Sequence, residues 1–342
     1  MARGTLKIVF TADDLARIRI APRADLMWEM VGSLHRLQSQ DGGPVIHEWR
    51  QRARRQIIDA GLLSQVRTTL IPLTPLARYF PDFLTPIEAQ DGPGPAIQAL
   101  ARTPGARVRH ELELLRGHVD LPADLEDLAG GEPEAIRRLS RTVSDYCRAV
   151  LTSHWVFVER ALARERAVML RGLSDGGVEQ VLSSFSPHVR WRFPVLEVDY
   201  PVAGREILLN GRGLTLIPSY FCRRSPIALA DPELSPVLVY PAPHRSNPEV
   251  VGSDALAALL GKTRADILRC IAMTQGCSTT ELAGRAGVPL ATASEHARVL
   301  RQAKLIDSVR QANLVLHYPT ELGQDIVSDR KRVGPGVALE RV

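Results

Sequence analysis

The most constraining feature of the sequence is a pair of helical patterns near its C-terminal end, separated by a turn that contains glycine. Thr279 is placed to cap the short stretch TELAGRAG, and Gly287 favours a left-handed end to that helix. The dipeptide Val288-Pro289 then leads into a longer helical pattern, LATASEHARVLRQAKLI. A short scaffold helix, a glycine turn and a second helix in this order predict a helix-turn-helix.

The segments on either side extend this prediction to a winged domain over residues 250–330. Two helical patterns come first, one over residues 254–260 with Ser253 as its cap and one over residues 264–273 capped by Thr263. After the helix-turn-helix, IDSVRQ and LVLHYP read as two strands joined by a tight turn at Gln311-Ala312-Asn313. Thr320 is then expected to cap a closing helix, ELGQDIVSD.

The second helix of the pair is expected to present one face to the core and the other to DNA. Ala293, Ala297 and Leu300 recur at helical spacing and form the predicted inner face. Hydroxyl groups on the opposite face can reach phosphate or base, a Glu can accept from cytosine, and an Arg can donate to guanine. The candidate DNA-contacting residues are Thr279, Thr280, Leu290, Ala291, Thr292, Ser294, Glu295, Arg298 and, at the expected wing tip, Arg310.

The stretches LLGKTRADILRCIA, STTELAGRAGVPLATASEHARVLRQAKLI and VLHYPTELG resemble the winged-helix domain of ArsR-type transcriptional regulators. The stretches VFTADDLARIRIA, SHWVFVERALARERA and GRGLTLIPSYF with VLVYPAP resemble the uncharacterised N-terminal domain of a group of actinobacterial regulators. Two departures predict slightly altered turns: Lys304 stands where a glycine usually follows the recognition helix, and the wing turn has no glycine. The Cys-Val-Cys-type signature of metal-sensing members is missing from TTELAGRAG, so we expect no metal site.

The stretch PAPHRSNPE at residues 241–249 contains three prolines and reads as a linker. We therefore expect an α+β chain, in which a mixed N-terminal domain over residues 1–245 precedes the winged helix-turn-helix. Residues 72–105 are broken by prolines and are expected to be irregular. The other expected elements are a strand over residues 5–10, a helical turn capped by Thr11, helices at 24–40, 45–60 and 62–71, a long helix or helix pair at 134–171, and a small antiparallel sheet over 188–241.

Composition gives weaker constraints. The chain has 342 residues, 45% of them hydrophobic, and a net charge of +5 that suits an anionic partner but does not establish one. The N-terminus lacks a signal-peptide pattern and no apolar run is long enough to span a membrane, so we expect a cytoplasmic protein. GxSxG, HExxH and Walker-type motifs are missing, so we expect neither an enzyme nor a cofactor.

Two further groups of residues admit a functional and a structural interpretation. Arg50, Arg52, Arg54 and Arg55 beside Trp49 suggest a nucleic-acid patch, although a solvated helix face explains such a charge run better. A second group, Cys270 and Cys277 with His296 nearby, suggests a redox or metal sensor, although packing of Cys270 in the core is the favoured interpretation.

A third group concerns an effector. Trp155, Trp191 and Phe193 suggest an aromatic pocket between the long helix and the sheet, where core packing is the alternative.

The sequence as a whole predicts a regulator that binds double-stranded DNA. We expect a homodimer, because one recognition helix reads few base pairs, and repression as the default mode. A small-molecule effector is a further expectation. The rival prediction is a ligand- or protein-binding module in which the winged helix mainly dimerises.

Overall fold

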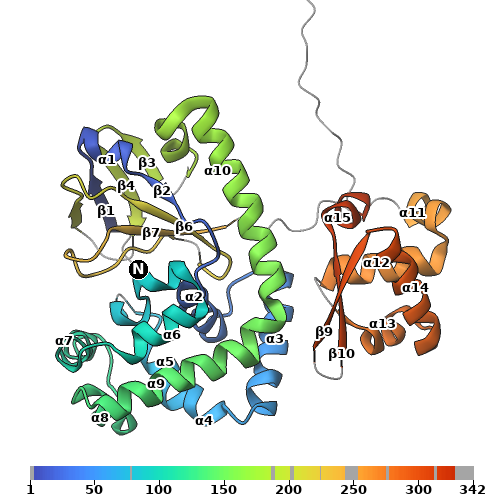
Figure 1. Cartoon of the computed structure of the whole chain (residues 1–342), viewed down its shortest axis with the longest axis horizontal. Helices are drawn as coiled ribbons and strands as arrows, with labels where there is room; N and C mark the ends of the chain where they lie inside the picture. The colour runs from blue at the N-terminus through green and yellow to red at the C-terminus, as the bar shows by residue number, and fades with distance from the viewer. Residues whose placement is uncertain are drawn as a thin grey trace, which may run out of the picture. The chain divides into compact units, whose positions relative to one another are not determined.

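The computed structural model describes residues 4–77, 79–185, 189–200, 204–223, 225–242, 253–274, 277–311 and 314–327. These residues fall into two compact units, one within residues 1–244 and the other within residues 245–342 (Figure 1). The predicted mixed helix-plus-sheet class is confirmed. Within the described ranges, no helix is long and apolar enough to cross a membrane. Residues 243–249 of the expected linker lie outside the described residues.

Helices dominate the N-terminal unit. The expected helices at 24–40, 45–60 and 62–71 are present, and the segment 134–171 forms a helix pair separated by π-helical and 3-10 turns over Cys147–His154. The helices are α1 (Ala12–Ala16), α2 (Leu26–Gln38), α3 (Pro44–Asp59), α4 (Leu63–Gln65), α5 (Ile71–Leu73), α6 (Pro93–Ala101), α7 (Gly105–Arg116), α8 (Glu126–Ala129), α9 (Pro133–Tyr146) and α10 (Trp155–Ser183).

The helix α6 corrects the expectation that residues 72–105 are irregular. Its first three residues are Pro93, Gly94 and Pro95. Backbone N–H groups in the first turn of a helix have no intrahelical acceptor, so proline removes no hydrogen bond there. The prolines therefore start this helix instead of preventing it.

Two small sheets lie beside the helices (Figure 1). The first has the order β3-β4-β1-β5, in which β1 (Gly4–Val9) is antiparallel to β4 (Val195–Tyr200) and parallel to β5 (Arg205–Leu208), and β3 (Val189–Arg192) is antiparallel to β4. The second joins β2 (Arg19–Ile20), β6 (Thr215–Ser219) and β7 (Val237–Pro241), all parallel.

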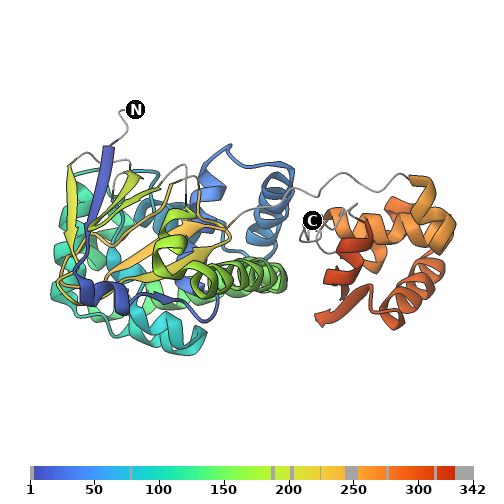
Figure 2. The same cartoon turned by 90° about the horizontal axis from the view of Figure 1, so that it is seen from above.

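This topology corrects the single antiparallel sheet expected over residues 188–241. The strands β6 and β7 are buried along almost their whole length, which is typical of parallel strands covered on both faces. The strands β1 and β2, far away in the sequence, complete the two sheets. The second half of α10, which is kinked where the backbone is non-helical at residues 176 and 177, covers them. Its Met169, Val181 and Leu182 share a core with Leu6 and Ile8 of β1 (Figure 2).

Buried carboxylates fasten the loops around β6 and β7 to the helices. Glu29 of α2 accepts hydrogen bonds from the backbone N–H groups of Tyr220 and Phe221, at 2.7 and 3.0 Å. Burial raises the pKa of Glu29 to about 7, against the opposing effect of these bonds. The carboxylate of Glu29 thus accepts from two backbone N–H groups that would otherwise be buried without hydrogen-bond partners.

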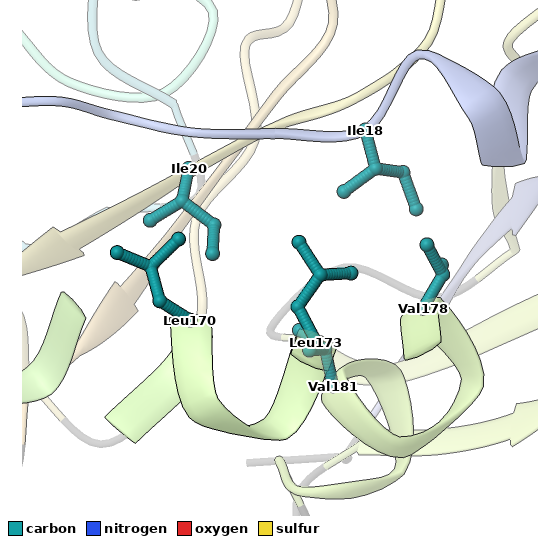
Figure 3. A pocket seen from close by; sticks show the side chains of 6 residues that line it. All are labelled: Ile18, Ile20, Leu170, Leu173, Val178 and Val181. Atoms are coloured by element: carbon teal, nitrogen blue, oxygen red, sulfur yellow. The ribbon is translucent and has the colours of Figure 1, made fainter. Parts of the chain in front are cut away.

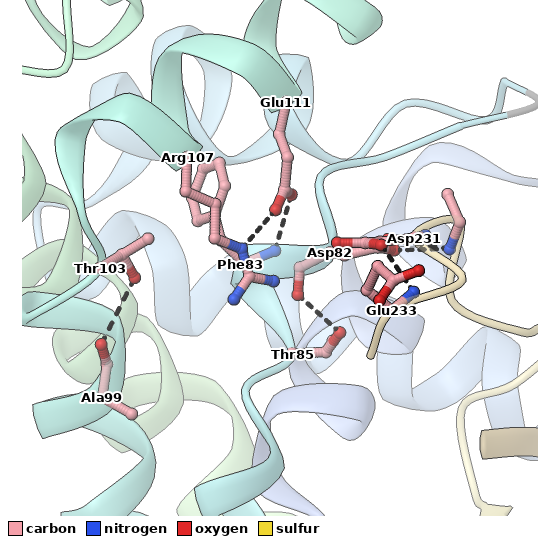
Figure 4. Close-up of polar contacts among 10 residues, drawn as sticks. Asp82, Phe83, Thr85, Ala99, Thr103, Arg107, Glu111, Asp231 and Glu233 are labelled. Carbon is pink, nitrogen blue, oxygen red and sulfur yellow. Dashed lines mark hydrogen bonds and ion pairs between the residues drawn. The ribbon is translucent and has the colours of Figure 1, made fainter. Parts of the chain in front are cut away.

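Asp82 and Glu111 make a second set of hydrogen bonds between carboxylates and backbone N–H groups (Figure 4). Asp82 accepts from the N–H groups of Ala230 and Asp231, at 2.8 and 2.7 Å. Glu111 of α7 accepts from the N–H of Phe83 at 2.8 Å and from Nε of Arg107 at 2.6 Å. The loop before β7 is therefore tied to the helical part through two successive carboxylates.

The close approach of α2 to the chain after β6 generates a stability prediction. A Cβ atom on Gly32 would lie 2.9 Å from Cβ of Phe221 and 3.0 Å from its carbonyl carbon. We expect Gly32→Ala to lower the free energy of unfolding by about 1–3 kcal/mol, because the helix must move away from the loop that Glu29 holds. Urea unfolding followed by circular dichroism measures the change.

The control is Gly172→Ala in α10. Its added Cβ would meet Val181 at an ordinary 3.7 Å, so the better helix propensity of alanine should raise the free energy of unfolding by up to about 1 kcal/mol. A Gly32→Ala protein as stable as the control would contradict the close packing.

Candidate nucleic-acid interface

The C-terminal unit has the order of elements predicted for a winged helix-turn-helix (Figure 1). Its core combines buried side chains from five helices with Cys277 and Ile306 from the strands. The elements are α11 (Ser253–Leu260), α12 (Lys262–Thr274), β8 (Cys277–Ser278), α13 (Thr279–Ala286), α14 (Leu290–Gln302), β9 (Ile306–Gln311), β10 (Leu314–Pro319) and α15 (Glu321–Val327).

Two of the expected helix caps are corrected, and one is confirmed. The N-cap of α13 is Ser278, whose hydroxyl accepts from the N–H of Glu281 while Glu281 accepts from the N–H of Ser278. Thr263 lies inside α12, which begins at Lys262. Thr320 does cap α15, because its hydroxyl accepts from the N–H of Gly323 at 3.0 Å.

The turn between α13 and α14 has the conformation expected of its glycine. Gly287 has φ +64° and ψ +34°, in the left-handed region, and its N–H bonds to the carbonyl of Ala283. The helix α14 then starts after Pro289. This turn determines how the second helix leaves the first.

The helix α14 presents the two predicted faces. Ala293, Ala297 and Leu300 are each at most 1% exposed. Outward-facing positions of its first two turns carry the expected small or polar side chains, and Leu290 at its start is 54% exposed. Of the predicted contact residues, Ala291, Ser294, Glu295, Arg298 and Leu290 are exposed and Thr292 is partly exposed.

An ion pair occupies the middle of the exposed face. Arg298 donates from Nη2 to Oε1 of Glu295 at 2.6 Å and from Nε to Oε2 at 2.9 Å. The hydrogen bonds from Arg298 hold the pKa of the Glu295 carboxyl below its usual range. Both side chains are in solvent, where such a pair adds little stability and is easily exchanged for another partner.

The remaining predicted contact residues lie at the start of α13 and on the wing. Thr280 is exposed, whereas the hydroxyl of Thr279 bonds to Nε2 of His317 at 2.9 Å. The other ring nitrogen of His317 bonds to the hydroxyl of Ser308 at 2.8 Å, so this imidazole joins α13 to both wing strands. Arg310 is exposed but pairs with Val315 in the β ladder, so it precedes the tip at which it was expected. Residues 312 and 313 of the expected turn lie outside the described residues.

The structure adds exposed residues that the sequence interpretation missed. Arg301 and Lys304 follow Arg298 along the same end of α14 and are exposed. On the wing, Leu314 is 54% and Val309 is 42% exposed. The helical spacing of Arg298 and Arg301 in the sequence indicated that Arg301 shares the exposed side of α14. By contrast, no sequence signal distinguished Val309 and Leu314 from the core residues of a strand.

The aromatic effector site is corrected, because Trp191 and Phe193 lie edge to face, with ring centroids 6.2 Å apart, but Trp155 belongs to a different core. Trp155 packs against the helical core and its Nε1 donates to Glu159, whereas Trp191 packs against the sheet core next to Phe10. Phe193 is 58% exposed. The reason is the length of α10, since Met169, the first of its residues to reach the sheet core, lies about 20 Å along the helix from Trp155.

A different pocket lies between α10 and the segment around β2. It has a volume of about 100 Å³ and is lined only by aliphatic side chains: Ile18, Ile20, Leu170, Leu173, Val178 and Val181 (Figure 3). Pockets that hold metabolites usually measure about 300–1,000 Å³ and present some polar groups. This pocket therefore does not replace the effector site.

The arginine patch suggested for residues 49–55 is divided by burial: Arg54 and Arg55 are exposed and Arg52 is partly exposed, as on a solvated helix face, but the first two residues are not. Trp49 is 2% and Arg50 is 3% exposed. Arg50 donates to the carbonyl oxygens of Arg36 and Asp41, and the ring of Trp49 lies 4.5 Å from that of Phe221. These two residues are part of the core of the N-terminal unit and cannot contact a nucleic acid there.

Comparison with known proteins agrees with the C-terminal geometry. A family model described as a helix-turn-helix domain matches residues 259–309, from the end of α11 into β9. No curated protein matches the chain, and no solved structure does. This part of the chain is a helix-turn-helix domain, the kind of domain by which transcription regulators bind DNA.

The turn after α14 generates a prediction at Lys304. Its φ of +56° is left-handed, its N–H bonds to the carbonyl of Arg301, and the N–H of Leu305 bonds to the carbonyl of Leu300. This is a Schellman ending, in which glycine is favoured because a Cβ atom is strained. We expect Lys304→Gly to raise the free energy of unfolding by about 1 kcal/mol, measured by denaturant unfolding of the whole chain.

Lys304→Ala is the matched control. It removes the same charge and side chain but keeps the Cβ atom, so it should bring no such gain. Equal stabilisation by both substitutions would show that loss of the positive charge, and not relief of backbone strain, is the cause.

Proposed function

We propose that this protein is a sequence-specific transcriptional regulator of ArsR type, which inserts α14 into the major groove of double-stranded DNA. The observation that carries the proposal is the division of α14 into a buried alanine-rich face and an exposed face with hydroxyl, carboxylate and guanidinium groups. The small side chains at its N-terminal end let the backbone approach the base edges closely. The exposed wing beside it, with Arg310, suits contact with the flanking backbone.

Within this proposal the protein acts as a homodimer and as a repressor. A single helix of this length contacts few base pairs, and two copies on a symmetric operator double the number read. Repression is the simplest outcome of occupying a promoter. Because ordering a unit of some 240 residues is costly, we also propose that the N-terminal unit supplies dimer contacts and a response to a small molecule.

The rival function is a ligand- or protein-binding module in which the winged helix mainly dimerises. The exposed basic and polar face of α14 favours DNA binding over this rival. Selection of bound fragments from random duplex DNA distinguishes them, because only a regulator enriches a defined site. The slope of the logarithm of the affinity against the logarithm of the salt concentration then reports how many phosphates are contacted.

The first prediction on this function concerns α14. With a duplex recovered by selection, Arg298→Ala should weaken binding by about 1–3 kcal/mol if the side chain reads a base, and should reduce the salt slope by about one if it contacts a phosphate. Thr292→Ala and Ser294→Ala should each weaken binding as well. Fluorescence anisotropy measures the affinities.

Arg137→Ala is the matched control, because Arg137 is also exposed and also pairs with a glutamate at i,i+3, but lies on α9. It should leave the affinity unchanged. If all three α14 variants fold and bind like the wild type, α14 is not the recognition helix.

The second prediction concerns the N-terminal unit. A fragment starting near Pro248 should bind the selected duplex more weakly than the whole chain, because the proposed dimer contacts are lost. Analytical ultracentrifugation and binding titrations on both proteins measure mass and affinity. A fragment that is itself dimeric and binds as tightly as the whole chain would refute this role of the N-terminal unit.

A further inference from the structure

Two thiols of the C-terminal unit are in hydrogen-bond contact. Cys270 lies in the second half of α12 and Cys277 begins the short strand β8. Cys277 is only 1% exposed, whereas Cys270 is half-buried and packs at the edge of the same core. The other two cysteines, Cys147 and Cys222, are buried in the N-terminal unit.

The backbone around Cys277 is connected to the scaffold helix α13 and to the wing. Cys277 pairs with His317 of the wing strand β10. The next residue, Ser278, is the N-cap of α13, and Thr279 bonds to the same His317. A displacement of β8 relative to α12 therefore acts on the scaffold helix and on the wing at once.

We propose that Cys270 and Cys277 form a reversible thiol–disulfide switch that lowers the affinity of the helix-turn-helix for DNA when oxidised. This proposal rests on the proposed function only in its second part, the change in affinity for DNA. Formation of the bond itself depends on the contact between the two thiols and on the accessibility of Cys270.

The oxidant is a peroxide. The sulfur of Cys270, as thiolate, attacks one oxygen of hydrogen peroxide, the O–O bond breaks, and Cys270 becomes a sulfenic acid while hydroxide leaves and takes up a proton as water. The sulfur of Cys277 then attacks the sulfur of Cys270, losing its proton, and the second oxygen leaves as water. Two thiols are oxidised by two electrons, and one peroxide is reduced to two waters. An external thiol reverses the reaction by exchange.

The environment of each thiol sets this order of events. The hydrogen bond with Cys270, together with burial, raises the pKa of Cys277, so Cys277 is a protonated thiol at neutral pH and is a poor first nucleophile. Burial also raises the pKa of Cys147 and of Cys222 to about 12, so these thiols should resist oxidation. Selectivity for the Cys270–Cys277 pair therefore depends on the partial exposure of Cys270, since the other three thiols are buried.

The bond changes local geometry because a disulfide is shorter than a thiol contact. The two sulfurs must close to about 2.05 Å, which shortens a hydrogen-bond contact by more than 1 Å. The strand β8 has two residues and α12 is a packed helix, so β8 is the element that moves. Its movement alters the cap of α13 and the pairing with the wing.

The experiment treats the whole chain with hydrogen peroxide and measures three quantities. A loss of two mass units and peptide mapping report the Cys270–Cys277 bond, and anisotropy with a selected duplex reports affinity. We expect a single internal disulfide, a roughly tenfold weaker affinity, within the usual range for coupled sites, and full recovery after dithiothreitol.

Cys270→Ser and Cys277→Ala should bind DNA in the absence of oxidant and should lose the response to peroxide. Cys147→Ser should keep the full response. Because Cys277 is buried, Cys270→Ser is the decisive variant if Cys277→Ala fails to fold.

The outcomes separate the two proposals. Peroxide that oxidises Cys147 or Cys222 before joining Cys270 to Cys277 overturns the switch, as does a mapped disulfide that leaves the affinity unchanged. A reduced wild-type chain that binds no duplex overturns the proposed function instead, and in that case the mapping still reports whether the thiol pair is oxidised selectively.

Discussion

The geometry of the proposed DNA-binding face depends on the burial of three small or apolar side chains on one side of α14. Ala293, Ala297 and Leu300 pack into the core of the C-terminal unit, and their burial fixes the rotation of the helix about its axis. Successive residues of a helix are turned by about 100°, so this rotation also decides which side chains face solvent. Two alanines at the contact let α14 lie close to its neighbours, which a larger pair of side chains would prevent. The side chains that α14 offers for the proposed recognition are thus determined by how the opposite face packs.

The N-terminal unit adds a different kind of interaction to its hydrophobic cores. Carboxylates of α2, of the 3-10 turn at Asp82–Leu84 and of α7 accept from backbone N–H groups of chain segments distant in the sequence. Such contacts fix the position of each loop relative to its carboxylate, because a loop that moved away would leave a buried N–H without an acceptor, which is costly. They are also sensitive to protonation: the pKa of Glu29 is raised above its value in the unfolded chain, so the stability that this group contributes is present below that unfolded value and is lost as the pH rises through about 7. A neutral amide in place of Glu29 removes this dependence.

The sequence predicted the elements best where the signal was local. Gly287, Pro289 and the alanine spacing in α14 each specify a conformation within a few residues, and the turn and the helix faces were right. The cap of α13 was misassigned by one residue although the spacing Ser278 to Glu281 is that of a capping box, a signal that was present and not used. The pairing of β2 with β6 joins residues 20 and 216, and nothing local indicates it. The aromatic site failed for the same reason, since Trp155 packs in a different core from Trp191.

The ion pair on α14 has a consequence for how a regulator of this kind discriminates between sequences. Before any contact with DNA, the guanidinium of Arg298 already holds a carboxylate with the planar geometry that it would use on a guanine edge. Binding is then an exchange of one acceptor for another, with Glu295 left near the phosphates unless a cytosine amino group receives it. A duplex that offers an acceptor to Arg298 and a donor to Glu295 replaces both hydrogen bonds. A duplex that offers only an acceptor to Arg298 would leave the carboxylate of Glu295 unpaired in a negatively charged groove. The pair would therefore act as a filter, lowering the affinity for arbitrary DNA more than for the operator.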